Sequence, residues 1–239
     1  MLEPMLSVAR HFSLESPAQL QWAHRVNTPA ALEAACAEAG LHMLEADVYM
    51  GRADATPLIK THRNATSELD VATWLAAAEA AGKGVKLDLH TAAAVEPTLD
   101  IIRTWEMETP VVLHADVFHL LAGRNGAEAM EPEQFIRLVS TYAPQALISV
   151  GWSLKRPHDA DGRVEDALVQ QMSAMLLQRL GPASYGVEIR AGYAPTRDGV
   201  PGERGAALLL EPVPPPPPAD EASASGNVVS ILPHLRRVA

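Results

Sequence analysis

Leu44-Glu45-Ala46-Asp47-Val48 is the stretch from which the fold of this chain can be predicted. In an extended strand, residues i and i+2 point to the same face. Glu45 and Asp47 would therefore project together, while the apolar residues beside them pack on the opposite face. Two neighbouring carboxylates repel each other unless a cation lies between them, and Mg²⁺ or Ca²⁺ is the usual oxygen-seeking ion. The alternative is a solvent-facing edge strand with alternating acidic residues.

Strand and helix patterns alternate outward from this stretch. We predict strands at 19–24, 42–49, 57–62, 84–90, 110–117, 146–152, 185–191 and 206–210, and helices at 29–39, 67–82, 92–104, 132–142 and 164–180. This alternation is typical of an α/β fold with a parallel sheet and crossover helices. Eight strands in about 210 residues favour a (β/α)8 TIM-type barrel. A doubly wound open sheet is the second choice.

Four segments are expected along the chain. Residues 1–17 form an N-terminal arm or a short helix, and residues 18–211 form the barrel. Its last βα unit is eroded, because 192–204 is rich in Gly, Pro and charge and shows no helical pattern. Residues 212–227 form a proline-rich flexible linker, and 228–239 form a C-terminal segment.

Composition excludes several classes of protein. The 239 residues carry a formal net charge of −10, which argues against a nucleic-acid surface. No run reaches the ~20 apolar residues of a membrane span. The N-terminus lacks the apolar core of a signal peptide, so a cytoplasmic protein is expected. Cys36 lies in an Ala-rich helical pattern, which favours a small apolar role over a nucleophilic one. The oligomeric state stays open.

Polar residues follow the predicted strands at the ends where a βα barrel carries its functional groups. They are His24, Arg25, Glu45, Asp47, His62, Arg63, Lys86, Asp88, His114, Asp116 and Trp152. For each residue a structural role is the alternative. A histidine can be a hydrogen-bonded structural residue, Asp88 can pair with a neighbouring Lys or Arg, and Trp152 can pack the barrel interior.

Together these residues make chemical sense as a phosphodiester site. The carboxylates of Glu45, Asp47 and Asp88 would hold one divalent cation, Mg²⁺ or Ca²⁺, that polarises a phosphoryl oxygen. Two residues that titrate near neutrality, His24 and His62, would act as general base and general acid. Phosphate charge would be neutralised by two cationic side chains, Arg25 and Lys86.

Five short motifs resemble the menorin family. They are W-A-H-R-V-N at 22–27, L-E-A-D-V at 44–48, K-L-D at 86–88, L-H-A-D-V at 113–117 and S-V-G-W at 149–152. The menorin domain is similar to the phosphodiesterase barrels, and the first two motifs also resemble those of glycerophosphodiester phosphodiesterases. The resemblance runs from about residue 20 to residue 190 and implies a barrel related to these enzymes.

Carried over from that superfamily, His24 and His62 resemble the catalytic histidines. Glu45, Asp47 and Asp88 resemble the metal ligands, and Lys86, His114 and Trp152 join Arg25 as substrate-binding candidates.

The chain departs from these patterns at several positions. Val26 replaces the glycine of His-Arg-Gly, and Arg63 replaces the Asp that follows the second histidine. Asp88 stands where Glu is usual, and His114 stands where the menorin pattern has Asn. These differences bear on the substrate more than on the fold.

The leading hypothesis is a metal-dependent phosphodiesterase-like hydrolase or lyase that acts on a glycerol- or lipid-type phosphodiester. The alternative is a non-catalytic barrel that binds a phosphorylated or anionic ligand or a protein partner, which the missing glycine and the altered third acid favour. A third hypothesis is a barrel hydrolase that uses Asp47 and Asp88 as an acid/base pair without metal.

Overall fold

The computed structural model describes residues 3–51, 56–105, 107–119, 130–153, 178, 185–190 and 207–210. The helices are α1 (Glu3–His11), the short 3-10 helix η1 (Pro17–Gln19), α2 (Pro29–Ala37), α3 (Val71–Ala80), α4 (Ala92–Thr104) and α5 (Pro132–Tyr142). The strands are β1 (Trp22–Ala23), β2 (Met43–Met50), β3 (Pro57–Ile59), β4 (Gly84–Leu89), β5 (Val111–His119), β6 (Leu147–Ser153), β7 (Tyr185–Arg190) and β8 (Ala207–Leu210).

The strands form one mixed sheet in the order β1-β2-β4-β5-β6-β7-β8. Neighbouring strands from β1 to β7 are parallel, and they follow one another in chain order without reversal. A doubly wound sheet reverses its strand order at a switch point, and no such reversal occurs among the described strands. The ladders described here do not pair β8 with β1, so the observed fold is an α/β fold with a largely parallel sheet.

Two predicted barrel strands run against the others. β3 pairs antiparallel with β2, through Val48↔Ile59 and Met50↔Pro57, and lies off the main strand order. It shares an edge of β2 with β1, so 57–62 is a hairpin arm and not a separate βα unit. β8 pairs antiparallel with β7. The prediction of eight successive parallel strands was therefore wrong at these two places, because strand pattern alone does not encode strand direction.

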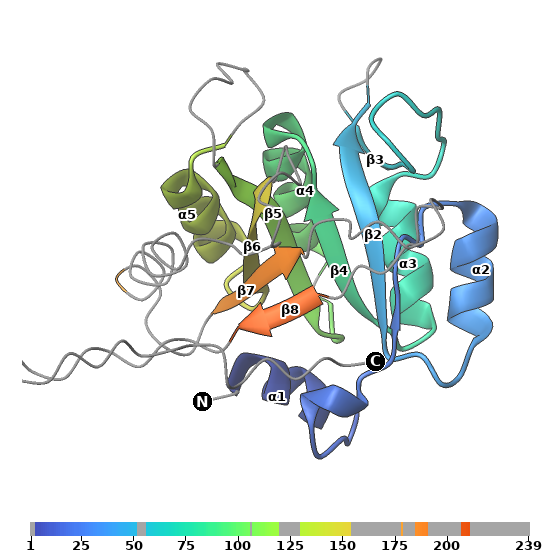
Figure 1. The fold of residues 1–239 in the computed structure, drawn as a ribbon. Coiled ribbons are helices and arrows are strands. Elements are labelled where there is room, and N and C mark those ends of the chain that lie inside the picture. The colour runs from blue at the N-terminus through green and yellow to red at the C-terminus, as the bar shows by residue number, and fades with distance from the viewer. Residues whose placement is uncertain are drawn as a thin grey trace, which may run out of the picture.

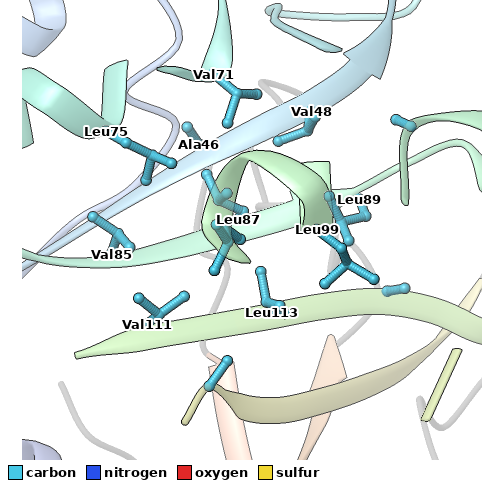
Figure 2. Close-up of a cluster of buried hydrophobic side chains, with 14 of the residues drawn as sticks. Ala46, Val48, Val71, Leu75, Val85, Leu87, Leu89, Leu99, Val111 and Leu113 are labelled. Carbon is cyan, nitrogen blue, oxygen red and sulfur yellow. The ribbon is translucent and has the colours of Figure 1, made fainter. Parts of the chain in front are cut away.

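One face of the sheet packs against the helices. Figure 1 shows α3 and α4 beside β2 and β4, and α5 next to them. Alternate residues of each strand supply this core, including Leu44, Ala46 and Val48 of β2, which are all fully buried. Figure 2 shows Ala46 and Val48 in one cluster with Leu87 of β4 and Leu99 of α4. The predicted division of β2 into an apolar face and an acidic face is confirmed.

Local signals explain where the helices begin. Thr28 caps α2 by accepting a hydrogen bond from the Ala31 N–H at 3.2 Å, and Pro29 occupies the first turn. The expected start of α3 at Ser67 was wrong. That helix begins at Val71, because the Asp70 carboxylate caps it by accepting from Thr73 N at 2.7 Å.

The N-terminal arm contains α1, which covers the other face of the sheet near the start of the strands. Val8 and Ala9 of α1 are buried against Met43 of β2 and Val112 of β5. Among the described residues, none of the helices is long and apolar enough to cross a membrane. The predictions for 192–204, 212–227 and 228–239 lie outside the described residues, as does that for 164–180 apart from Gln178.

Candidate functional site

The polar residues lie on the face of the sheet that points away from α2–α5. The strand registers align them in rows across the sheet, since directly paired residues point to the same face. One row contains Asp47, Asp88, His114 and Ser149, on β2, β4, β5 and β6. The row toward the strand starts pairs Glu45 with Lys86. The edge-strand alternative for Glu45 and Asp47 is wrong, because both residues are only 8% exposed and β2 is paired on both edges.

Glu45 lies between a histidine and a lysine. Its Oε2 contacts His24 Nδ1, and its Oε1 lies 3.3 Å from Lys86 Nζ. The same ammonium lies 3.1 Å from Asp88 Oδ1. Both Lys86 and Asp88 are buried, so this is an ion-paired group in a region of low dielectric. The pairing of Asp88 with a neighbouring lysine is thus present in the fold.

Asp47 is held by Asn27 and His90. Its Oδ2 accepts from Asn27 Nδ2 at 2.6 Å, and its backbone N–H donates to Asn27 Oδ1 at 2.8 Å. His90 Nε2 lies 2.6 Å from Asp47 Oδ1. Burial raises the pKa of Asp47, but the hydrogen bond and charge of His90 and the hydrogen bond from Asn27 outweigh it. The pKa of Asp47 therefore lies below its usual value, and its ionised form is favoured.

The loop between β1 and α2 carries His24 and Asn27 to β2. Val26 N–H donates to Glu45 O at 2.8 Å, and the buried Trp74 of α3 donates from Nε1 to Val26 O at 2.9 Å. The chain turns at Arg25, which has φ +56°, and the Asn27 N–H donates to Arg25 O. The left-handed residue of this turn is therefore Arg25. Val26, at the position of the family glycine, is buried in the core.

His114 lies further along the same face. It is almost fully buried, with Nδ1 2.8 Å from Ser149 Oγ and Nε2 3.3 Å from Asp116 Oδ1. Its register partner on β4 is Asp88. Both ring nitrogens thus have polar neighbours, as expected for a buried imidazole.

The donor set fits a divalent cation. Asp47, Asp88 and His90 each offer one ligand atom, and these atoms all lie within 4.8 Å of one another. Lys86 carries one formal charge against the three carboxylates of Glu45, Asp47 and Asp88, so it offsets only part of their charge. Carboxylates and imidazole are ordinary ligands of divalent ions.

The other predicted residues lie at different distances from this group. His24 is directly beside it, with its side chain 47% exposed and stacked on Trp22. Arg25 is exposed in the next position. His62 is exposed in the loop after β3, and among the described residues its side chain has no hydrogen bond or ion pair with the carboxylates. The backbone of Trp152 pairs with Phe118, and its side chain lies outside the described residues.

Sequence reasoning missed two residues of this group, Asn27 and His90. Asn27 resembled a helix-capping residue because it precedes Thr28-Pro29. His90 was taken as the end of a strand. A period-2 signal could have identified it, since Lys86, Asp88 and His90 alternate with apolar residues along the chain.

Comparison with known proteins gives a family match. The model of the menorin N-terminal domain matches residues 17–196. The human protein FAM151B is 26% identical over 180 residues, which cover 72% of this chain and 64% of the human protein. The chain thus spans less than two thirds of that relative.

A weaker likeness exists to a solved structure. A crystal structure from Silicibacter pomeroyi, named as a candidate glycerophosphoryl diester phosphodiesterase, overlaps with a TM-score of 0.46 at 15% sequence identity. The overlap covers 75% of this chain and 77% of the other. A likeness at this level carries no inference about function.

Proposed function

The chain belongs to the menorin family, and from this premise we propose that it is a metal-dependent phosphodiesterase-like hydrolase or lyase. Its substrate would be a glycerol- or lipid-type phosphodiester. The observation that carries the proposal is the convergence of His24, just after β1, with Glu45, Asp47 and Asp88 on one face of β2 and β4. Carboxylates beside a partly exposed imidazole are suited to chemistry at phosphorus.

We also propose that the sheet closes into a barrel. The unreversed order from β1 to β7 and the helices gathered on one face support this. The polar face would then be the barrel interior, with its functional groups at the carboxyl ends of the strands. β8, antiparallel to β7, would take the closing position next to β1.

Glu45, Asp47 and Asp88 would hold the cation, Mg²⁺ or Ca²⁺. Once bound, such an ion would polarise a phosphoryl oxygen and offset its charge. Glu45 also contacts His24 Nδ1, so it orients the ring. The remaining ring nitrogen is then available to exchange a proton with the substrate, since this side chain is 47% exposed.

The proton transfers follow from this geometry. His24 would take the proton from the attacking oxygen, which belongs to water in a hydrolase and to a substrate hydroxyl in a lyase. As the bond to phosphorus forms, the bond to the leaving oxygen breaks, and a second acid protonates that oxygen. His62 is proposed for this role, and its exposed loop would have to approach the site when substrate binds.

Four residues are proposed to bind substrate. Arg25 is exposed next to His24 and would pair with phosphate oxygens. The ammonium of Lys86 contacts Glu45 and Asp88, and its positive charge would offset the negative charge of a bound phosphate. His114 and Trp152 would contact the remainder of the substrate.

A turnover assay tests the proposal. The wild type is incubated with glycerophosphocholine, lysophosphatidylcholine and bis(p-nitrophenyl) phosphate in the presence of Mg²⁺ or Ca²⁺. We expect His24→Ala and His62→Ala each to lower kcat by about 10²–10⁴-fold, the usual worth of general acid–base catalysis. The exposed His11 of α1 provides a matched control, His11→Ala, which should keep full activity. Full activity in both site variants would contradict the assignment of the histidines.

Calorimetry with Mg²⁺, Ca²⁺ and Mn²⁺ separates the alternatives. Binding should disappear in Glu45→Gln/Asp47→Asn and persist in Glu33→Gln/Glu96→Gln, which changes two exposed helix carboxylates. Metal binding without turnover on any substrate would favour the non-catalytic barrel. Turnover that survives exhaustive chelation would favour the metal-free pair of Asp47 and Asp88.

A further inference from the structure

His90 lies where a metal ligand is expected. It follows β4 two residues after Asp88, so the two side chains extend from the same face of the sheet. Asp47 is the register partner of Asp88 on β2. One ligand atom from each of these three residues lies within 4.8 Å of the other two. Two strands therefore direct two carboxylates and one imidazole toward a common point.

The ring of His90 is held in place on two sides. Its backbone N–H donates to Val48 O at 3.0 Å, which fixes the chain just beyond β4. Its ring stacks on Tyr49, with centroids 4.8 Å apart and an interplanar angle of 11°. Nε2 lies 2.6 Å from Asp47 Oδ1. A ring held in this way loses little conformational freedom when it binds an ion.

Glu45 is engaged differently from Asp47, while Asp88 shares the Lys86 ammonium with Glu45. Its two oxygens contact His24 and Lys86, so a cation that used Glu45 would compete with both. No such competition with an ammonium affects Asp47, whose oxygens contact only neutral or titratable donors, Asn27 and His90, among the described side chains.

We propose that His90, together with Asp47 and Asp88, directly ligates the cation, and that the site prefers a first-row transition-metal ion such as Mn²⁺ over Mg²⁺ and Ca²⁺. This rests on the proposed function only in that a divalent ion binds here. Mg²⁺ and Ca²⁺ favour oxygen ligands, whereas an imidazole nitrogen suits first-row transition metals. Asp88 stands where Glu is usual in the related enzymes, and its side chain is shorter. In this scheme the imidazole nitrogen of His90, at the end of the same strand, supplies an additional ligand.

Binding requires one proton to move. In the structure the Asp47–His90 contact needs a proton between Nε2 and Oδ1. An ion bound to both atoms replaces that proton, and neutral imidazole can carry it on Nδ1 instead. The step forms bonds from the metal to Nε2 and Oδ1 and changes no oxidation state.

Pulsed electron paramagnetic resonance of bound Mn²⁺ tests the proposal directly. The wild type with Mn²⁺ should show nitrogen coupling from one imidazole, and ¹⁵N-histidine labelling should shift the coupling frequency. The coupling should disappear in His90→Ala and in His90→Gln, and it should persist in His24→Ala and His11→Ala. If the His90 variants fail to fold, labelled wild type still shows whether a histidine binds the ion, and His24→Ala shows whether that histidine is His24.

Calorimetry gives a second readout. The wild type should bind Mn²⁺ more tightly than Mg²⁺, and His90→Gln should weaken Mn²⁺ binding at least about tenfold while Mg²⁺ affinity changes by less than about threefold. Wild-type Mn²⁺ without histidine coupling, or coupling that persists in His90→Ala, would overturn the proposal. Turnover without histidine coupling would contradict this inference and leave the proposed function intact. Histidine coupling without turnover would support this inference and contradict the proposed function.

Discussion

Both polar atoms of the Asn27 side-chain amide form hydrogen bonds with one residue, Asp47. The amide oxygen accepts from the Asp47 backbone, and the amide nitrogen donates to the Asp47 carboxylate. The side chain of Asn27 thus fills the place on the edge of β2 that a paired strand would fill. Because Asn27 is buried, removing its amide would leave polar groups of Asp47 without these partners in a region that excludes water.

Asn27→Ala should lower the free energy of unfolding by about 1–3 kcal/mol, the cost of leaving a buried polar group unsatisfied. Urea denaturation followed by circular dichroism measures it. The exposed amide of Gln21 is the matched control, and Gln21→Ala should change stability by about 0.5 kcal/mol or less. Equal effects of the two substitutions would show that the Asn27–Asp47 contacts contribute little.

Cys36 shows how a residue's surroundings limit its chemistry. The thiol is partly buried, with Sγ 3.6 Å from Ala77 O of α3. Burial raises the pKa of the Cys36 thiol, and the charge of Lys83 opposes this only in part. A reactive cysteine needs a lowered pKa. The packing role expected from its helical pattern therefore agrees with its environment.

At the scale of elements, the glycine that begins β4 leaves room for a buried methionine side chain of β2. Gly84 pairs with Met43 in the parallel register. A Cβ at Gly84 would overlap the Met43 sulfur and lie 3.2 Å from Pro110 O. Met43 itself is fully buried against α1, so it has little room to move. The missing side chain at Gly84 leaves room for the Met43 side chain, which packs with α1.

Gly84→Ala should destabilise the protein by about 1–3 kcal/mol, the usual cost of overpacking a core. The control is Gly40→Ala, where the nearest atom is the flexible Glu38 Oε1 at 3.4 Å. A double-mutant cycle with Met43→Ala adds a check by urea denaturation. If Gly84→Ala costs as much without the methionine side chain as with it, the clash with Met43 is not the cause.

At the scale of the whole molecule, the sheet separates two environments. One face joins the helices in a continuous apolar core, and the opposite face carries the buried charges of Glu45, Asp47, Lys86 and Asp88. β4 lies in the middle of this arrangement, paired with β2 on one edge and β5 on the other. All six residues of β4 are buried.

Rates of native-state amide hydrogen exchange should therefore differ between β4 and β3. Amides of β4 should exchange only through global unfolding, at about 5–15 kcal/mol, because both edges of the strand are paired. Amides of β3, which pairs with β2 and otherwise forms an isolated bridge to Asp70, should exchange through smaller local openings. Mass spectrometry at increasing urea concentrations compares peptides from the two strands. Equal protection of β3 and β4 would contradict this view of the core.

The sequence predicted the elements better than their arrangement. Helices 92–104 and 132–142 match α4 and α5 at both ends, because apolar periodicity and proline signals are local. The facing of Glu45 and Asp47 followed from strand alternation alone. The antiparallel directions of β3 and β8 could not be predicted, because strand direction depends on which partner a segment meets in the fold.

The sequence by itself determined the two-faced character of β2, the parallel α/β class and the menorin resemblance, because each depends on residue order along short segments. Only the tertiary structure decided which polar groups meet. Lys86 forms ion pairs with Glu45 and Asp88. Asp47 is hydrogen-bonded by Asn27 and contacted by His90 Nε2. Except for the contact between Lys86 and Asp88 within β4, these contacts link residues 20 to 43 positions apart in the chain, so only the pairing of strands in register brings them within bonding distance.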